Sequence, residues 1–316
     1  MTAAPHDAEL APIREAVRAL CAEFPGEYWR KVDRERAYPT EFVEALTKAG
    51  FLGALIPEEY GGSGLTMPAA AAIMEEIHAA GCNGAACHAQ MYTMGTVLRH
   101  GSAAQKQQYL PGIASGALRL QAFGVTEPTS GTDTLSLRTT AMKDGNSGYV
   151  VNGQKIWTSR AEHSDLMLLL ARTTPREQAK SRTDGLSVFL VDMRAVKGKG
   201  LTIRPIRTMM NHATTEVFFD NMKIPADSLV GEEGKGFSYI LHSLNPERVL
   251  IGTEAVAIHQ RSDVCAVPAA GVVAEVVGDQ QLVIVDLHRQ GGAAAAAGHA
   301  HPRPGGEAVG GGVVGV

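Results

Sequence analysis

The chain has 316 residues, of which 45% are hydrophobic and 20% are charged, so it is long enough for two or more buried cores and too apolar to be disordered throughout. Its formal net charge of -4 gives no electrostatic reason to expect nucleic acid or an anionic membrane surface as a partner. The N-terminal stretch MTAAPHDAEL lacks an apolar signal segment, and no run reaches the roughly 18 apolar residues that span a bilayer. The four cysteines are widely scattered, which favours reduced thiols, and we expect a cytoplasmic protein.

Residues 1–120 have the pattern of an N-terminal helical domain. Ile13, Val17 and Leu20 recur at the spacing of one buried face of an amphipathic helix. Proline, serine and glycine at suitable positions predict where other helices begin and end. The further helices expected on these grounds run from Pro39 to Gly50, from Pro68 to Gly81, and from Ser102 to about Pro111.

The apolar period changes beyond Phe123 to that of β-strands. The run YVVNGQKIW predicts a hairpin with a type I′ turn at Asn152 and Gly153, because this pair tolerates positive φ angles. LMLLLAR, LSVFLVDM, LTIRPI and TEVFFDNMKI are read as further strands. Since no helical run separates them, we expect residues 121–232 to form an antiparallel β-barrel, with a sandwich as the alternative.

Residues 233–258 predict the first helix of a C-terminal helical domain, kinked or restarted at Pro246. Residues 259–316 contain no Lys, Phe, Tyr, Trp or Met, and they end in a Gly- and Ala-rich stretch that we expect to be disordered. VVAEVV and QQLVIVDL read as short strands without an evident partner. The fold class is therefore α+β multidomain with a truncated C-terminal domain, and the abrupt change after Ile258 suggests a shifted reading frame or a truncated gene model.

Three patterns were weighed and set aside. GEEGKG (231–236) lacks the spacing of a phosphate-binding P-loop, and GGSG (61–64) has no βαβ unit around it. The soft metal ligands cluster only in one place, and their spacing matches no common zinc finger, so no metal is expected. These four residues are His78, Cys82, Cys87 and His88.

The stretch FGVTEPTSGTD, from Phe123 to Asp133, combines small hydroxyl side chains with many backbone N–H groups at the entry to the β-region. Such a loop can bind a flat polar ligand edge or a pyrophosphate without steric bulk. An ordinary Ser/Thr turn is the alternative interpretation.

Four motifs in sequence order resemble the acyl-CoA dehydrogenase family over about residues 8–258. They are ALIPEEYGGSGL, FGVTEPTSGTD, NGQKIWTS and VFFDNMKIPADSLVGEEGKGF. The resemblance implies a helical N-terminal domain and a central β-barrel that bind FAD, completed by a C-terminal four-helix bundle. It also implies an acyl-CoA substrate, an electron-transferring flavoprotein as electron acceptor and a homo-oligomer, commonly a tetramer.

The resemblance also assigns flavin contacts to individual residues. Those near the pyrimidine side of the flavin are Phe123, Val125 and Thr126, and Thr132 matches the residue that reaches both the FAD pyrophosphate and the pantetheine arm of the substrate. Trp157 would cover the ring, with Thr158 beside it and Ser159 near flavin N5.

The implied reaction is α,β-dehydrogenation, in which a carboxylate removes the α-proton and the β-hydride passes to the flavin. The resemblance places this base at Glu247, with Asn245 and Arg248 near the substrate, whereas an ion-paired helix residue is the alternative for Glu247. The family's Arg-x-x-Phe-Gly-x-Pro and Gln-x-x-Gly-Gly-x-Gly segments are absent, so weak or no activity is expected of the chain as written.

Three other functions stay open at this point. An acyl-CoA oxidase or a flavin monooxygenase would use the same fold. A non-catalytic remnant would bind flavin or acyl-CoA without turnover, and a structural or interaction protein would bind no flavin.

Overall fold

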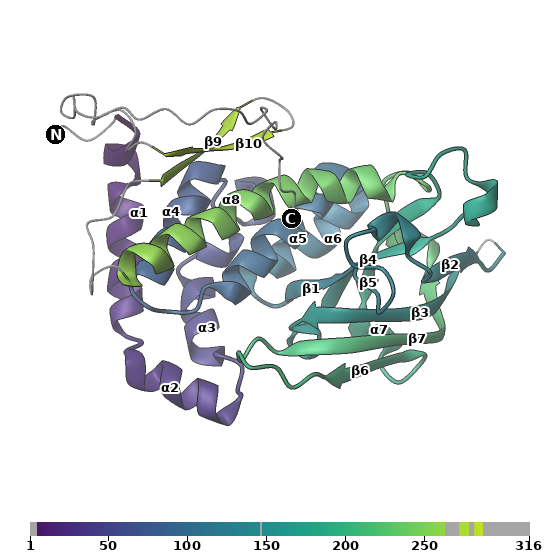
Figure 1. Ribbon diagram of the computed structural model, residues 1–316, viewed down its shortest axis with the longest axis horizontal. Coiled ribbons are helices and arrows are strands. Elements are labelled where there is room, and N and C mark those ends of the chain that lie inside the picture. Colours follow the sequence, from purple (N-terminus) through teal and green to yellow (C-terminus); the bar gives the residue numbers. More distant parts are fainter. Residues whose placement is uncertain (1–4, 146, 263–271, 278–280, 287–316) are drawn as a thin grey trace, which may run out of the picture.

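The computed structural model describes residues 5–145, 147–262, 272–277 and 281–286 of the chain. Helices from the N-terminal part pack on one side, strands form a sheet on the other, and one long helix crosses the other helices (Figure 1). The helices are α1 (Pro5–Ala22), α2 (Gly26–Glu35), α3 (Thr40–Lys48), α4 (Met67–Ala79), α5 (Ala85–His100), α6 (Ala103–Ser115), α7 (Met193–Val196) and α8 (Gly236–Ser262). The strands are β1 (Leu120–Gly124), β2 (Thr140–Lys143), β3 (Gly148–Ser159), β4 (Leu166–Arg172), β5 (Leu186–Asp192), β6 (Leu201–Pro205), β7 (Thr214–Pro225), β8 (Leu229–Val230), β9 (Val272–Val277) and β10 (Gln281–Asp286).

The predicted helices are present, but one of them ends later than expected. On α1, Val17 is fully buried and Ile13 and Leu20 pack against the same core, as the spacing predicted. Helix α6 begins after a complete capping box at Ser102, but it continues through Pro111 to a C-cap at Gly116. Its expected end at Pro111 is wrong, because a proline removes only one helical donor and the buried side chains on either side of it keep the helix in place.

Helices α2 and α5 were not expected from the sequence. Helix α5 lies in the interior, where it contacts β1 and α8, and Cys87, Met91 and Met94 on it are fully buried. A helix covered on most sides has no polar face, so its sequence lacks the amphipathic pattern by which surface helices are recognised.

The strands form a sheet in the order β6-β7-β3-β2-β4-β5-β8, with β1 added beside β4. The bounds of β4 and β5 agree with the predicted strands. Neither a closed barrel nor a purely antiparallel sheet is found among the described strands: β6 and β8 end the order, and β1 runs parallel to β4. The sheet is mixed because β1, which follows directly after the last N-terminal helix, pairs with β4 in parallel orientation.

The predicted hairpin at Asn152 and Gly153 is wrong. Strand β3 continues through this pair, with only a register irregularity between Val151 and Gly153 in its pairing with β7. Gly153 has a φ of 145°, and a Cβ there would lie 2.7 Å from the Cα of Thr139, so the glycine is needed for close approach of two backbones. The turn between β2 and β3 instead follows Lys143, with Gly145 at a φ of 59°.

Helix α8 is one continuous helix that passes through Pro246 and ends at Ser262. Apolar side chains on its outer side are exposed: Leu241 is 38%, Ile251 45% and Ile258 50% accessible. Strands β9 and β10 pair with each other in antiparallel fashion, so the two segments that had no evident partner in the sequence are partners. The remainder of the predicted disordered tail lies outside the described residues, and none of the helices that the structure describes has the length and apolarity to span a membrane.

A fully buried ion pair joins the FGVTEPTSGTD loop to β3. Lys155 Nζ lies 2.8 Å from Glu127 Oε1 and donates to the carbonyl oxygen of Val125 at 2.9 Å. The Glu127 carboxylate also accepts from the backbone N–H groups of Arg138 and Thr139. Burial would raise the pKa of Glu127, but Lys155 and these donors lower it below its ordinary value.

Replacing Glu127 with Gln should destabilise the protein by about 3–5 kcal/mol, because Lys155, whose pKa burial already lowers to about 8, would have to keep a buried charge without its partner or give up its proton. Denaturant unfolding monitored by circular dichroism measures this change in free energy. The control is Lys223→Met, which removes an exposed ion pair with Asp144 and should cost less than about 1 kcal/mol. Equal small losses in both variants would contradict the structural role of the buried pair.

Candidate functional site

The FGVTEPTSGTD loop lies directly beside the end of β3. The backbone N–H of Ile156 donates to the carbonyl oxygen of Thr126 at 2.9 Å, so the residue that follows Ile156 emerges next to this loop. That residue is Trp157. The two motifs that carry most of the predicted flavin contacts are therefore neighbours in the folded chain.

Trp157 is held in an unusual backbone conformation with an exposed side chain. Its φ is 62°, and the pairing of β3 with β7 shifts register between Lys155 and Thr158. The indole is 57% exposed, which is high for the largest apolar side chain. Positive φ at a bulky residue costs free energy and is typical of sites where a side chain is presented for function.

The other predicted flavin residues differ in exposure. Phe123, Val125 and Ser159 are partly buried, and Thr132 lies exposed farther along the loop. Thr158 is buried and its hydroxyl oxygen has no hydrogen-bond partner among the described residues. Buried hydroxyls are nearly always paired, so this oxygen is suited to a ligand or an ordered water.

Glu247 on α8 lies close enough to Tyr92 on α5 for its charge to act on the phenol, and Tyr92 in turn contacts Phe123. The ring of Tyr92 lies 5.7 Å from that of Phe123 in an edge-to-face arrangement. Burial raises the pKa of Tyr92, and the nearby charge of Glu247 raises it further. Three segments that are far apart in the sequence thus meet here.

The environment of Glu247 is that of a carboxylate with raised basicity. Burial raises its pKa above the ordinary carboxyl value; His88 and Arg248 oppose this, and Glu254 adds to it. A raised pKa favours proton acceptance by a carboxylate, as a general base requires.

Asn245 and Arg248, the predicted substrate contacts, bond to each other. Arg248 Nη1 donates to Asn245 Oδ1 at 2.7 Å, and Arg248 is exposed. They lie on either side of Glu247 along α8.

A buried polar cluster of His78, His88 and Glu254 lies near Glu247, and the sequence pattern does not predict it. His88 Nδ1 lies 3.1 Å and His78 Nε2 3.7 Å from the Glu254 carboxylate, at the distance of an ion pair but without the alignment of a hydrogen bond. Arg160 lies close by, and burial lowers its pKa while Tyr92 and Glu254 oppose this effect. The one pattern in the sequence that bears on this cluster is the seven-residue spacing of Glu247 and Glu254. This spacing places both carboxylates on one face of a helix.

The four soft ligands do not converge. The histidines turn to Glu254, the thiol of Cys82 lies 3.8 Å from the carbonyl oxygen of Cys21, and Cys87 is fully buried. Throughout the described part of the chain, no group of three or more His, Cys, Asp or Glu side chains is arranged to hold a metal ion.

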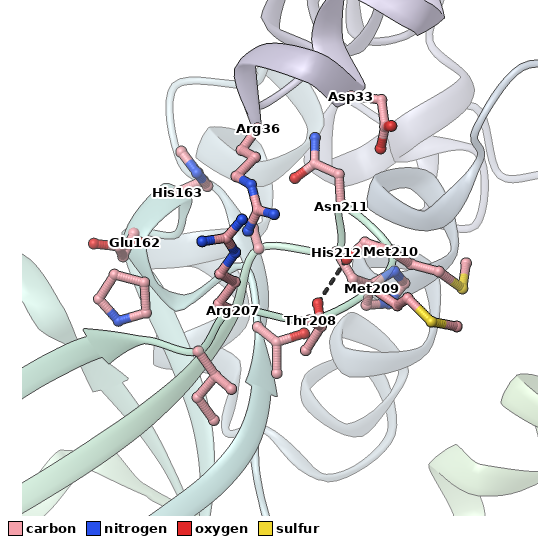
Figure 2. Close-up of a pocket in the computed structure, with 14 residues that line it drawn as sticks. Asp33, Arg36, Glu162, His163, Arg207, Thr208, Met209, Met210, Asn211 and His212 are labelled. Carbon is pink, nitrogen blue, oxygen red and sulfur yellow. Dashed lines mark hydrogen bonds between the residues drawn. The ribbon is translucent and has the colours of Figure 1, made fainter.

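A hollow of about 260 Å³ lies between the end of α2 and the segment that connects β6 to β7 (Figure 2). Arg36 and Arg207 line it, and Thr208 donates to the carbonyl oxygen of Met210 at 2.6 Å along its wall. Neither Thr126 nor Trp157 lines this hollow. The hollow therefore contains none of the residues that the sequence predicts to contact a flavin or a substrate.

Comparison with known proteins identifies the two domains of the chain. The N-terminal domain of acyl-CoA dehydrogenases matches residues 7–117 and the middle domain matches residues 122–222. Cyclohex-1-ene-1-carbonyl-CoA dehydrogenase of Syntrophus aciditrophicus is 33% identical over 253 residues, covering 78% of this chain and 59% of that protein. Acyl-CoA dehydrogenase fadE12 of Mycobacterium bovis is also 33% identical, covering 79% of this chain and 63% of that protein.

The fold comparison gives the same result. The crystal structure of an acyl-CoA dehydrogenase from Geobacillus kaustophilus superposes with a TM-score of 0.74 at 30% identity, covering 80% of this chain and 66% of that one. Two adjacent domain matches and this superposition define the chain by both sequence and fold. It belongs to the acyl-CoA dehydrogenase family, and it spans about three fifths of the length of the curated relatives named above.

Glu254 should make the folded protein sensitive to acid. Burial would raise its pKa, but His78 and His88 outweigh this and lower it to about 2, below the ordinary value of 4.5. Because the unfolded chain binds this proton first, the stabilising contribution is present above about pH 4.5 and is lost as the pH falls toward 2.

Glu254→Gln should therefore lose less stability than the wild type between pH 5 and 3, as measured by urea unfolding at several pH values. Glu44→Gln, which changes an exposed side chain on α3, is the matched control. Identical acid sensitivity of Glu254→Gln and the wild type would contradict the pairing with the two histidines.

Proposed function

We propose that this protein catalyses, or contributes to, the α,β-dehydrogenation of an acyl-CoA thioester with FAD as cofactor. The observation that supports it best is that the Thr126 loop lies beside the exposed indole of Trp157 at the end of β3. Tyr92, which contacts Phe123 of this loop, is also within reach of the charge of Glu247. Family membership supports the same reaction class.

The chain has groups that fit a flavin. The exposed indole of Trp157 offers a flat apolar surface, and the unpaired buried hydroxyl of Thr158 offers a polar partner beside it. Phe123, Val125 and Thr126 would lie along one edge of the ring, Ser159 along another, and Thr132 would contact the pyrophosphate. FAD, when bound, supplies the acceptor for the β-hydrogen and its electron pair.

The residues of the chain would position the thioester and remove its α-proton. Glu247 is the proposed base, because burial raises its pKa and so strengthens it as a proton acceptor. Asn245 and Arg248 would contact the substrate near this carboxylate. Tyr92, which is partly buried between α8 and the loop residue Phe123, would help to exclude water from the reacting carbons.

The remaining elements of the proposal concern partners and location. An electron-transferring flavoprotein is the proposed acceptor, a homo-oligomer the proposed assembly, and the cytoplasm the proposed location. Turnover with oxygen alone would favour an oxidase or monooxygenase, and bound flavin without turnover would favour a binding role.

Reconstitution with FAD should give a yellow protein whose visible absorbance bleaches on addition of a suitable acyl-CoA. Trp157→Ala should weaken FAD binding about 2- to 10-fold, the equivalent of one aromatic stacking contact, as measured by fluorescence titration. Met142→Ala, which removes another exposed apolar side chain, is the control and should bind FAD like the wild type. Absence of any flavin binding by the wild type would contradict the proposed function.

Glu247→Gln should reduce the turnover of the chain, which we expect to be weak, by at least about 100-fold, because the amide cannot accept the α-proton. FAD binding should not change, which separates loss of the base from loss of the fold. The assay is reduction of an artificial electron acceptor in the presence of acyl-CoA, and Glu44→Gln is the control. A fully active Glu247→Gln variant would show that another group removes the proton.

A further inference from the structure

The polar cluster of His78, His88 and Glu254 is built from three helices that pack together. The three residues come from α4, α5 and α8, and α8 lies across the other two helices (Figure 1). Their side chains are only 10%, 13% and 15% exposed. The cluster is therefore interior, and the proposed reaction has no use for it.

His88 Nε2 has no partner among the described residues, whereas Glu254 Oε1 faces His88 Nδ1 at 3.1 Å and His78 Nε2 faces the other Glu254 oxygen at 3.7 Å without the alignment of a hydrogen bond. Buried polar atoms in folded proteins are nearly always paired, and a group of such atoms in one place indicates a ligand or ordered water. A cavity of about 460 Å³ adjoins the cluster and is large enough for several non-hydrogen atoms. Its lining includes His78, Met210, His212, Glu254, Ile258 and Arg261.

The cluster lies about two helical turns along α8 from Glu247, the proposed base. Glu254 follows Glu247 by seven residues, so both lie on one face of α8, separated by about 10.5 Å along the axis. His88 precedes Tyr92 by one helical turn, and their rings lie 5.1 Å apart. The face of α8 that carries Glu247 thus also carries Glu254, and the face of α5 that carries Tyr92 also carries His88.

We propose that this cluster receives the distal part of the acyl chain and selects acyl groups that carry a hydroxyl or carbonyl oxygen there. The proposal rests on the proposed function, which puts the reacting carbons at Glu247. An extended chain advances about 1.2 Å per bond, so an oxygen roughly eight bonds beyond these carbons reaches Glu254 and His88.

The chemistry of the cluster supports this choice of substrate. The imidazole nitrogens can accept from a hydroxyl or, when protonated, donate to a carbonyl oxygen, and Glu254 Oε1 can accept from a hydroxyl. A plain hydrocarbon end would leave His88 Nε2 without a partner and His78 Nε2 with only its loose ion pair to Glu254. Sites built to bond an oxygen discriminate strongly against the analogue that lacks it.

The test compares the binding of decanoyl-CoA and 10-hydroxydecanoyl-CoA to the FAD-reconstituted chain by isothermal titration calorimetry. The hydroxylated ligand should bind at least about tenfold more tightly, as expected of one hydrogen bond to a charged group. 10-oxodecanoyl-CoA, tested alongside, separates a hydroxyl preference from a carbonyl preference. Equal affinity of decanoyl-CoA and both oxygenated ligands would overturn the inference and leave the proposed function standing.

Variants connect the preference to the cluster. His88→Leu should abolish it, His88→Gln should retain part of it, and His100→Leu, on the same helix but outside the cluster, should keep it in full. Circular dichroism melting confirms that each variant is folded, and His78→Leu provides a second route if His88→Leu is not. A preference that survives in folded His88→Leu and His78→Leu would overturn the inference, whereas failure of all three ligands to bind would overturn the proposed function with it.

Discussion

The buried ion pair between Glu127 and Lys155 is the contact on which the candidate site depends. A lysine at a fully buried position loses its hydration, and only the Glu127 carboxylate and the carbonyl oxygen of Val125 replace it. The same carboxylate holds the backbone of Arg138 and Thr139, so one side chain fixes both ends of the loop. Glu127 of FGVTEPTSGTD and Lys155 of NGQKIW therefore have a structural role. Their pairing leaves the hydroxyl groups of the loop and the Trp157 indole available for a ligand.

The second requirement is the packing of α8 across α4 and α5. This contact brings Glu247 to Tyr92 and Glu254 to the two histidines, across more than 150 residues of sequence. The result is a pair of carboxylates on one helix face with opposite pKa displacements. The pKa of Glu247 is raised, mainly by burial, and that of Glu254 is lowered by its histidine partners despite burial. Glu247 is therefore suited to accept a proton, whereas Glu254 is suited to stay ionised.

Much of the fold could be predicted from local pattern, and the errors have definite physical reasons. Asn152-Gly153 and Asp144-Gly145 are both good turn sequences, and only the pairing of β3 with β7 decides that the chain bends at the second. Pro111 and Pro246 are local helix breakers, yet tertiary packing carries both helices through them. Helix α5 was missed because burial on most sides removes the periodic pattern, and closure of a sheet into a barrel depends on edge pairing that no single strand encodes.

The sequence by itself determined the order of the domains, most strand positions, and the motifs that resemble the acyl-CoA dehydrogenase family, because these depend on residues close together in the chain. It also singled out Thr126, Trp157 and Glu247 as residues of interest. Only the tertiary structure decided that the loop and the indole are neighbours, that Tyr92 links Phe123 to Glu247, and that two histidines first weighed as metal ligands turn instead to Glu254. Contacts of this kind join atoms from distant segments, and the free energy of burying and pairing them exists only once the helices and the sheet have packed.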